Sequence, residues 1–204
     1  GSGWEMPYER VKAIPGLDLE RPRAEAVAEA VALLESVGFG PGELTFTHPG
    51  ATSPNYVPDA IIMTEMVKEI GVNMILEEVE RGVYYDTMQT GNFDVGGHKG
   101  YFRGTDPDGL FYEFYYPGSD RNYGRYSNPE AKRLIDLQSQ TIDPEKRKTI
   151  AWDAAELILR DVVRTFTGFT ADRTFFNNRV HGTMPGPVAM AGHWKQHKHT
   201  WVSE

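Results

Sequence analysis

The sequence predicts an α/β fold in which helices flank a small, mostly parallel sheet. Segments with strand character alternate with amphipathic helical segments, and turn signals separate them. A strand, a helix and a second strand follow one another over residues 43–77, and strands joined by such a crossover are parallel. The chain has 204 residues and no internal repeat or linker, which favours one continuous unit.

The first half of the chain contains this β-α-β unit behind an opening helix. Residues 23–35 carry alanine and leucine at helical spacing, which predicts an amphipathic helix. Residues 43–48 alternate with period two, so we expect a strand that stops at Pro49-Gly50. A helix from Pro58 to Ile70 and a strand over residues 72–77 follow. The expected buried face of that helix consists of Ala60, Ile61, Met63, Met66, Val67 and Ile70.

The middle of the chain predicts a third strand and then a long loop. A short helix over residues 84–88 precedes the strand, which we expect over residues 93–97. Residues 101–126 are rich in aromatic residues, glycine and aspartate without a clean period, which is typical of a loop with binding residues. Within it, residues 110–115 predict a short helix.

Two helices and a further strand are predicted after this loop. The helices begin where a capping side chain precedes proline, at Asn128-Pro129 and at Asp143-Pro144. Residues 164–176 alternate enough to predict a strand. Residues 180–204 contain glycine, proline and histidine and show no helical face.

Composition excludes several classes of partner and chemistry. With 21 Lys and Arg against 29 Asp and Glu, the formal net charge is −8, and no long basic run is present to bind nucleic acid or anionic lipid. Cysteine is absent, which excludes disulfides, thiolate nucleophiles and Cys-ligated zinc. No apolar run approaches the roughly 20 residues of a membrane span.

Compact catalytic motifs are also absent. There is no GxSxG, P-loop or HExxH sequence, and Gly96-Gly97 lacks the rest of a dinucleotide-binding loop. We therefore expect no catalytic residue and no cofactor. His193, His197 and His199 could together bind a metal ion, but the sequence around them favours a polar tail, and we expect no metal site.

Two histidines are candidates for ligand binding. His48 and His98 each lie near the C-terminal end of a predicted strand, the edge at which open α/β sheets bind ligands. Ser53 follows the first of these strands and belongs to the same candidate site. The alternative for each histidine is a hydrogen-bonded structural role.

The densest cluster of candidate residues spans residues 97–107. It combines flexible backbone, aromatic rings and a fixed positive charge, a mixture that suits ligand binding. Arg103 could bind a carboxylate or phosphate, while rings there could stack on a ligand. Alternatively, Arg103 pairs with Asp106 or Asp108 and only holds the loop. The candidate ligand-binding residues of this cluster are His98, Gly100, Tyr101, Phe102 and Arg103.

The order of these segments resembles the second lobe of the family 5 extracellular solute-binding proteins, which serve peptide- and nickel-type ABC transporters. The resemblance covers nearly the whole chain, and its short motifs keep the order of the family. These motifs are Leu33-Leu34-Glu35-Ser36-Val37-Gly38, Lys68-Glu69-Ile70-Gly71-Val72-Asn73, Gly91-Asn92-Phe93-Asp94, Asp106-Pro107, Tyr126 to Glu130, and Asp143 to Arg147.

The resemblance implies a lobe like those of type II periplasmic binding proteins. Residues 4–204 would form a single lobe of a two-lobed protein whose first lobe is absent, with Gly1-Ser2-Gly3 left by cloning. It implies a periplasmic or extracellular protein, not an enzyme, that captures a small solute such as a peptide, sugar or opine. Its partners would be that solute, the missing first lobe and an ABC permease. One lobe supplies only part of the site, so we expect weak binding.

One departure from the family pattern bears on the ligand. Peptide-binding members typically carry an aspartate in the aromatic loop that pairs with the amino group of the ligand, and counting back from Asp106-Pro107 puts Arg103 there. Gly100 stands in the place of the usual tryptophan, which Tyr101 could replace after a shift of one residue. Because Arg103 would repel a cationic amine, we expect a ligand with an anionic or hydroxyl-rich end.

Two other functions stay open on the sequence alone. One is a small α/β hydrolase or transferase, with His98 or His48 as the base and Asp94 or Asp106 orienting it. The other is an interaction or sensor module that keeps the lobe fold and binds no small ligand.

Overall fold

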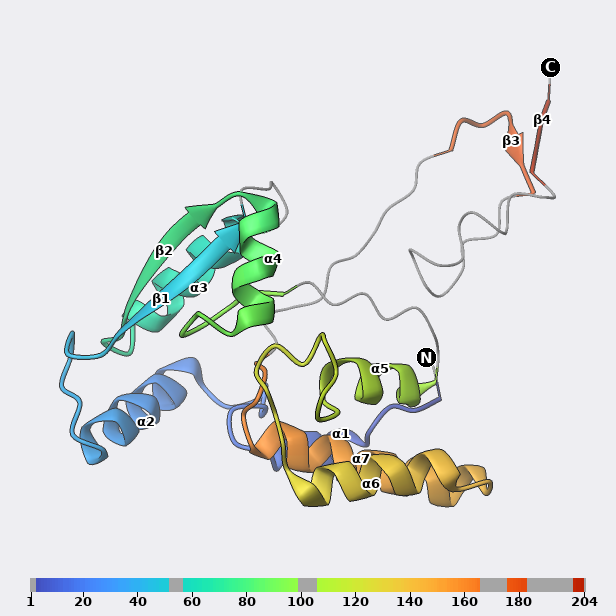
Figure 1. Ribbon diagram of the computed structural model, residues 1–204, viewed down its shortest axis with the longest axis horizontal. Helices are drawn as coiled ribbons and strands as arrows, with labels where there is room; N and C mark the ends of the chain where they lie inside the picture. The colour runs from blue at the N-terminus through green and yellow to red at the C-terminus, as the bar shows by residue number, and fades with distance from the viewer. Residues whose placement is uncertain (1–2, 52–56, 99–105, 166–175, 183–199, 204) are drawn as a thin grey trace.

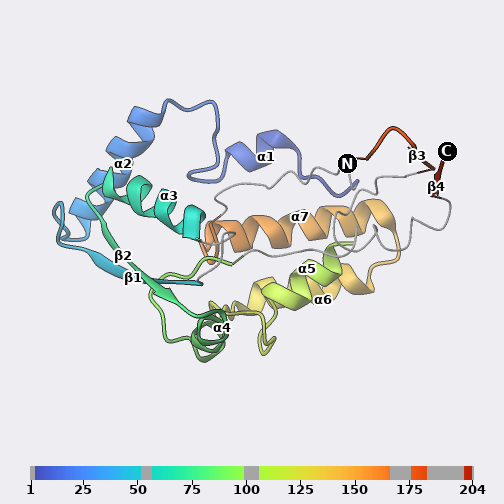
Figure 2. The same cartoon turned by 90° about the horizontal axis from the view of Figure 1, so that it is seen from above.

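Most of the helices and strands fall into two groups in the computed structural model, which describes residues 3–51, 57–98, 106–165, 176–182 and 200–203. Their bounds are α1 Tyr8–Lys12, α2 Arg23–Ser36, β1 Thr45–Ala51, α3 Val57–Lys68, β2 Asn73–Val79, α4 Arg81–Thr90, α5 Pro107–Phe114, α6 Pro129–Gln140, α7 Pro144–Arg160, β3 Val180–His181 and β4 Trp201–Val202. The sheet group contains β1, β2, α3 and α4, and the helical group contains α1, α5, α6 and α7 (Figures 1 and 2). Helices together with a small parallel sheet confirm the predicted α/β class.

The β-α-β unit is parallel, as predicted. β1 pairs with β2 over their full lengths, from Thr45 opposite Asn73 to Ala51 opposite Val79. The expected stop at Pro49-Gly50 is wrong, because both residues continue the pairing, opposite Glu77 and Glu78. Proline lacks one backbone donor but keeps its carbonyl and an extended backbone, so it is compatible with a strand outside the centre of a large sheet.

The buried face of α3 is narrower than the sequence predicted. Ala60 is buried at 2% exposure, but Ile61 and Met66 are 51% and 48% exposed. The described part of the sheet consists of two strands. A sheet of this width covers only a narrow stripe of the helix, which explains the exposed apolar side chains in physical terms.

The predicted third strand is wrong, although its segment does lie against β1. Residues 93–97 form no strand, while the N–H of Val95 donates to the carbonyl of Thr47 at 3.2 Å. The carboxylate of Asp94 accepts from both the backbone N–H and the hydroxyl of Thr47, at 2.9 and 2.8 Å. A side chain thus takes the place that a backbone carbonyl would hold in a continuous ladder.

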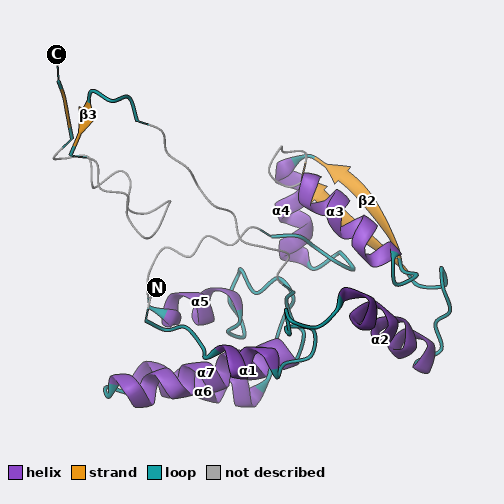
Figure 3. Ribbon diagram, turned by 180° about the vertical axis from the view of Figure 1, so that it is seen from behind, coloured by secondary structure: helices purple, strands orange, loops and turns teal. Residues whose placement is uncertain are grey.

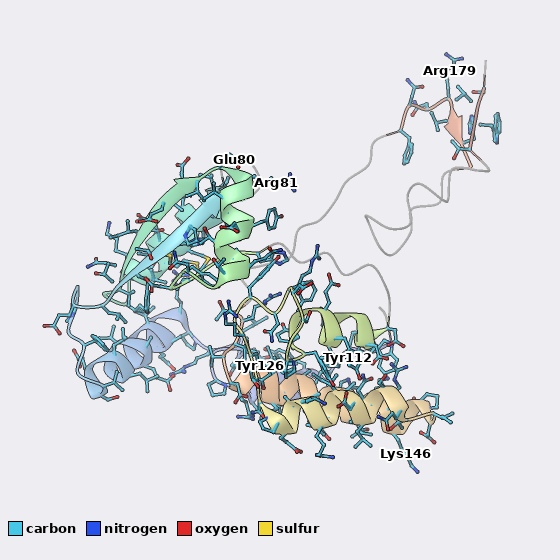
Figure 4. The ribbon with its side chains drawn as sticks, viewed as in Figure 1. Glu80, Arg81, Tyr112, Tyr126, Lys146 and Arg179 are labelled. Atoms are coloured by element: carbon cyan, nitrogen blue, oxygen red, sulfur yellow. The ribbon has the colours of Figure 1, made fainter. Side chains whose placement is uncertain are left out.

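Capping side chains begin the helices as the sequence predicted. Asn128 and Asp143 accept N–H groups in the first turns of α6 and α7, and proline opens both helices. In α4, the carboxylate of Glu80 accepts from two backbone N–H groups next to Arg81, where β2 ends (Figure 4). The predicted helices over residues 23–35, 58–70, 84–88 and 110–115 are all present, with ends shifted by a few residues.

The helical group has its own apolar core. It is built from buried side chains of α5, α6 and α7 and is covered at one side by Trp4, whose carbonyl accepts from Trp152 at 2.9 Å. Tyr112 in α5 donates to Asp136 in α6 at 2.9 Å, and Tyr126 donates to Asp161 at the end of α7 at 2.7 Å (Figure 4). The core residues are Phe111, Phe114, Tyr115, Ala131, Ile135, Ala151, Ala154 and Ile158.

A second, smaller core connects the two groups. Tyr84 and Met88 of α4 pack with Tyr123, which lies in the segment between α5 and α6. Arg125 donates to the carbonyls of Gln89 and Thr90 at the end of α4. The helical group is therefore fixed to the sheet group at the C-terminal end of α4.

The end of the chain is described only in part. β3 and β4 form an antiparallel pair, with Val180 opposite Val202, and lie away from both groups (Figures 1 and 3). Most of the strand predicted over residues 164–176 lies outside the described residues, as does most of the C-terminal tail. None of the described helices has the length and apolar character needed to cross a membrane.

Candidate functional site

His48 packs against Gly97, the residue that precedes His98 in the chain. His48 lies within β1 rather than at its end, and is buried at 2% exposure. Its Nδ1 lies 2.8 Å from the carbonyl oxygen of Pro49, which assigns the proton to Nδ1 and leaves Nε2 as an acceptor. Nε2 is buried and has no hydrogen-bond partner among the described residues.

Gly97 allows this close approach. A Cβ atom at residue 97 would lie 3.2 Å from Nε2 of His48, and one at residue 96 would lie 2.6 Å from the sulfur of Met88. The hydroxyl of Tyr84, which is fully buried, donates to the carbonyl of Gly97. The two glycines therefore serve packing against β1 and α4, a role that the sequence did not indicate.

His98 packs between two aromatic rings. Its ring centroid lies 5.8 Å from that of Phe114 and 5.2 Å from that of Tyr123, the latter in an edge-on arrangement. Its Nδ1 is buried and has no hydrogen-bond partner among the described residues. Burial, with the nearby charges of Arg164 and Arg121, lowers the pKa of His98 to about 4. The imidazole is therefore neutral at pH 7.

Two arginines lie near His98 on the helical side. The guanidinium carbon of Arg164 lies 4.9 Å from the ring centre of Phe114 and 5.6 Å from that of Tyr115. Arg121 forms an ion pair with Glu113 at 2.5 Å. Burial also lowers the pKa of His48. The site thus combines two neutral imidazoles, aromatic walls and a guanidinium, which can bind polar and anionic groups.

The carboxylates proposed to orient a catalytic histidine are engaged elsewhere. Asp94 binds Thr47, which holds the pKa of this carboxyl below its ordinary value. Asp106 forms a bidentate pair with Arg147 at 2.6 and 2.8 Å, and this pairing lowers its pKa. Arg147 also lies 3.5 Å from Asp108. An arginine of α7 therefore holds the start of α5, the role that the sequence left open for Arg103.

Only some of the predicted site can be placed. His48 and His98 are described, whereas Ser53, Gly100, Tyr101, Phe102 and Arg103 lie outside the described residues. The residues that sequence reasoning missed are those that surround His98. The aromatic character of residues 101–126 pointed to Phe114 and Tyr123 without showing which rings face the site, and no sequence signal indicated Tyr84 or Arg164. The missed residues are Tyr84, Phe114, Tyr123 and Arg164.

A separate cavity lies at the C-terminal end of α4. It has a volume of about 570 Å³ and is mainly polar. Neither candidate histidine lines it. The described residues contain no group of three metal-binding side chains, and His193, His197 and His199 lie outside them. The lining residues are Gln89, Pro117, Gly118, Ser119, Asp120, Asn122, Tyr123, Arg125, Tyr126 and Ser127.

Comparison with known proteins decides the family. The family model of the bacterial extracellular solute-binding proteins, family 5 middle region, matches residues 10–122, more than half of the chain. The chain belongs to this family. The match confirms the resemblance carried by the sequence motifs, and it confirms the expectation of a periplasmic or extracellular protein.

Individual relatives of this family 5 chain agree with the match. The periplasmic murein peptide-binding protein MppA of Escherichia coli is 31% identical over 139 residues, covering 67% of this chain and 26% of that protein. The periplasmic oligopeptide-binding protein OppA of Haemophilus influenzae is 28% identical over 149 residues, covering 70% and 27%. The chain therefore spans about a quarter of the length of these relatives.

A solved structure confirms the fold. OppA of Burkholderia pseudomallei matches with a TM-score of 0.72 and 21% identity, covering 90% of this chain and 36% of that one. At this identity the likeness concerns the fold alone. It confirms the predicted fold, which is that of periplasmic binding proteins of type II.

Proposed function

We propose that the chain is part of the solute-binding component of an ABC importer and that it binds a peptide-like solute. The observation that carries the proposal is the presence of buried nitrogens on His48, which packs against Gly97, and on His98, which follows Gly97; both nitrogens have no partner among the described residues. Buried polar atoms without a hydrogen-bond partner are costly, and a bound molecule that supplies the missing partner would remove this cost. Family membership supports solute binding, and the names of MppA and OppA support a peptide-like solute.

The chemistry of the site suits a peptide-like molecule. A peptide backbone offers both N–H and C=O groups, and Nε2 of His48 accepts while a neutral His98 can donate from one ring nitrogen and accept at the other. The rings of Phe114 and Tyr123 provide apolar walls. Ser53, Gly100, Tyr101, Phe102 and Arg103 stay proposed site residues on the sequence alone, because they lie outside the described residues.

The proposed capture of the solute needs a second lobe, because this chain would supply only part of the binding site. The rest of the longer protein would supply an opposing lobe, and closure of the lobes over the solute would create the form that the permease recognises. Contacts with the solute would offset the free energy of closure. This chain alone would supply part of these contacts and would bind weakly.

The expected anionic or hydroxyl-rich end of the ligand stays a prediction, because it rests on Arg103, which lies outside the described residues. If Arg103 occupies the place of the amine-binding aspartate, an anionic or hydroxyl-rich group is favoured there. Binding of matched anionic and cationic peptides would test this point, and a preference for the cationic peptide would contradict it.

The proposed function predicts that removal of the His98 imidazole weakens peptide binding. His98→Ala should weaken the binding of trialanine by about tenfold, which corresponds to about 1.4 kcal/mol, because a buried polar contact and ring packing are lost. Isothermal titration calorimetry measures the change. His181→Ala is the matched control, because His181 lies in β3, away from both groups (Figure 3).

Two results would contradict this proposal. Equal affinities for the original chain and His98→Ala would remove the histidine from the site. Hydrolysis of the peptide during the titration, detected by mass spectrometry and lost in His98→Ala, would favour the enzymatic alternative instead.

A further inference from the structure

A guanidinium lies against the candidate site without a described carboxylate partner. Arg164 follows α7, stacks on the rings of Phe114 and Tyr115, and forms no ion pair with any carboxylate that the structure describes. Other arginines of the helical group are neutralised, since Arg121 pairs with Glu113 and Arg147 pairs with Asp106. Arg164 thus contributes a positive charge that the described part of the site does not balance.

The backbone after α7 is strained in a way that positions this arginine. Val162 has a φ of 50°, in the left-handed region that β-branched residues avoid. The turn places Val163 against Gly124, with its side chain 3.7 Å from the position of a Cβ atom at residue 124. Arg164 is the second residue after the turn and reaches the rings of α5. Strain of this kind persists where the surrounding structure holds a residue in a required place.

Arg164 and His98 share the ring of Phe114. The imidazole of His98 and the guanidinium of Arg164 both pack on this ring, with centroid separations of 5.8 Å and 4.9 Å. A guanidinium that stacks on a ring by its face keeps its edge N–H groups for a planar acceptor. A carboxylate matches this edge with two parallel hydrogen bonds. A half-buried position strengthens such a pair relative to one in water.

We infer that Arg164 binds a carboxylate of the solute, beside the imidazole of His98. The inference rests on the proposed function and deepens it, since it assigns a specificity-determining residue for an acidic group. The carboxylate could come from the C-terminus of a peptide or from an acidic side chain, because both present the same planar acceptor.

Three probes separate these sources. Trialanine has a free C-terminal carboxylate, trialanine amide has none, and Ala-Glu-Ala amide carries a carboxylate only on its side chain. The chain should bind at least one of the two acidic peptides at least tenfold more tightly than trialanine amide, as expected for a charge-assisted hydrogen bond. Arg164→Gln should remove this difference. Arg133→Gln, which deletes the same charge from an exposed ion pair with Glu130, should preserve it.

The calorimetric outcomes are distinct. Equal binding of all three peptides, or a preference that survives in Arg164→Gln, would overturn the inference and leave the proposed function standing. Absence of binding by every peptide would overturn both. The amide spectra of both variants should match that of the original chain, which shows that they are folded.

A second readout separates a binding role from a structural one. Burial, together with the charges of Arg164 and Arg121, lowers the pKa of His98, and Arg121 pairs with Glu113. NMR titration of the His98 ring would measure this pKa with and without peptide. A bound carboxylate that pairs with Arg164 should raise this pKa. Arg164→Gln should raise it without ligand and abolish the further rise on binding. A rise on binding that persists in the variant would contradict the assignment.

Discussion

At the scale of single residues, the site depends on histidines that stay neutral. His48 is buried within β1 and His98 lies between aromatic rings, and burial opposes the protonated form of each. A neutral imidazole can accept as well as donate a hydrogen bond, which a protonated one cannot. Binding and stability should therefore both depend on pH.

His98 should make the chain less stable in acid. Its pKa is about 4 in the folded chain and about 6.5 when unfolded, so the unfolded chain takes up the proton first as the pH falls. The stabilisation is present above pH 6.5 and is lost between pH 6.5 and 4. Allowing for partial exposure, we expect a loss on the order of 2 kcal/mol.

Urea unfolding at pH 7.5 and pH 4.5 measures this loss. His98→Gln should reduce the difference between the two unfolding free energies, because glutamine does not titrate. His181→Gln should leave the difference unchanged. A difference of the same size in His98→Gln and the original chain would show that other groups cause it.

At the scale of secondary-structure elements, local signals predicted the helices better than the strands. Capping side chains before proline identified α6 and α7, because both the cap and the proline act within one turn. The third strand failed because Asp94 binds Thr47 through its side chain, and no local pattern distinguishes this contact from a backbone ladder. The exposure of Ile61 depends on the number of strands beneath α3, which is a property of the tertiary fold.

Local sequence also indicated some residues of the candidate site and missed others. His48 and His98 were candidates because each was expected near the C-terminal end of a strand, whereas His48 lies within β1 and residues 93–97 form no strand. The packing of His48 against Gly97 follows from the neighbouring positions of β1 and residues 95–98. The position of Arg164 could not be predicted, because it depends on a left-handed backbone at Val162. Single sequences carry little signal for such a conformation in a β-branched residue.

The two helix caps should differ in their contributions to stability. Asp143 accepts one backbone N–H of α7, whereas Asn128 accepts from two in α6 and also donates to Asp161 at 2.8 Å. Asp143→Ala should therefore lower the free energy of unfolding by about 1 kcal/mol, and Asn128→Ala by about 2 kcal/mol. Urea titration measures both. An equal loss in the two variants would mean that the link from Asn128 to Asp161 adds nothing.

At the scale of the whole molecule, the site lies where the sheet group meets the helical group. β1 provides His48, α4 provides Tyr84, and the helical group provides Phe114, Tyr123 and Arg164. The small core around Tyr84 fixes these contributions relative to one another. A solute at this junction would contact both groups, as expected for a lobe that presents half of a closing site.

The most direct test of solute binding at this junction is an NMR titration of the isotopically labelled chain with trialanine. We predict that the amide signals of His48, Gly97, His98 and Phe114 shift in proportion to occupancy, while those of β3 and β4 do not. Shifts confined to Gln89, Asp120 and Arg125 would place the ligand in the separate polar cavity instead. That result, or unchanged spectra at saturating peptide, would contradict the proposal that the chain binds a peptide-like solute between His48 and His98.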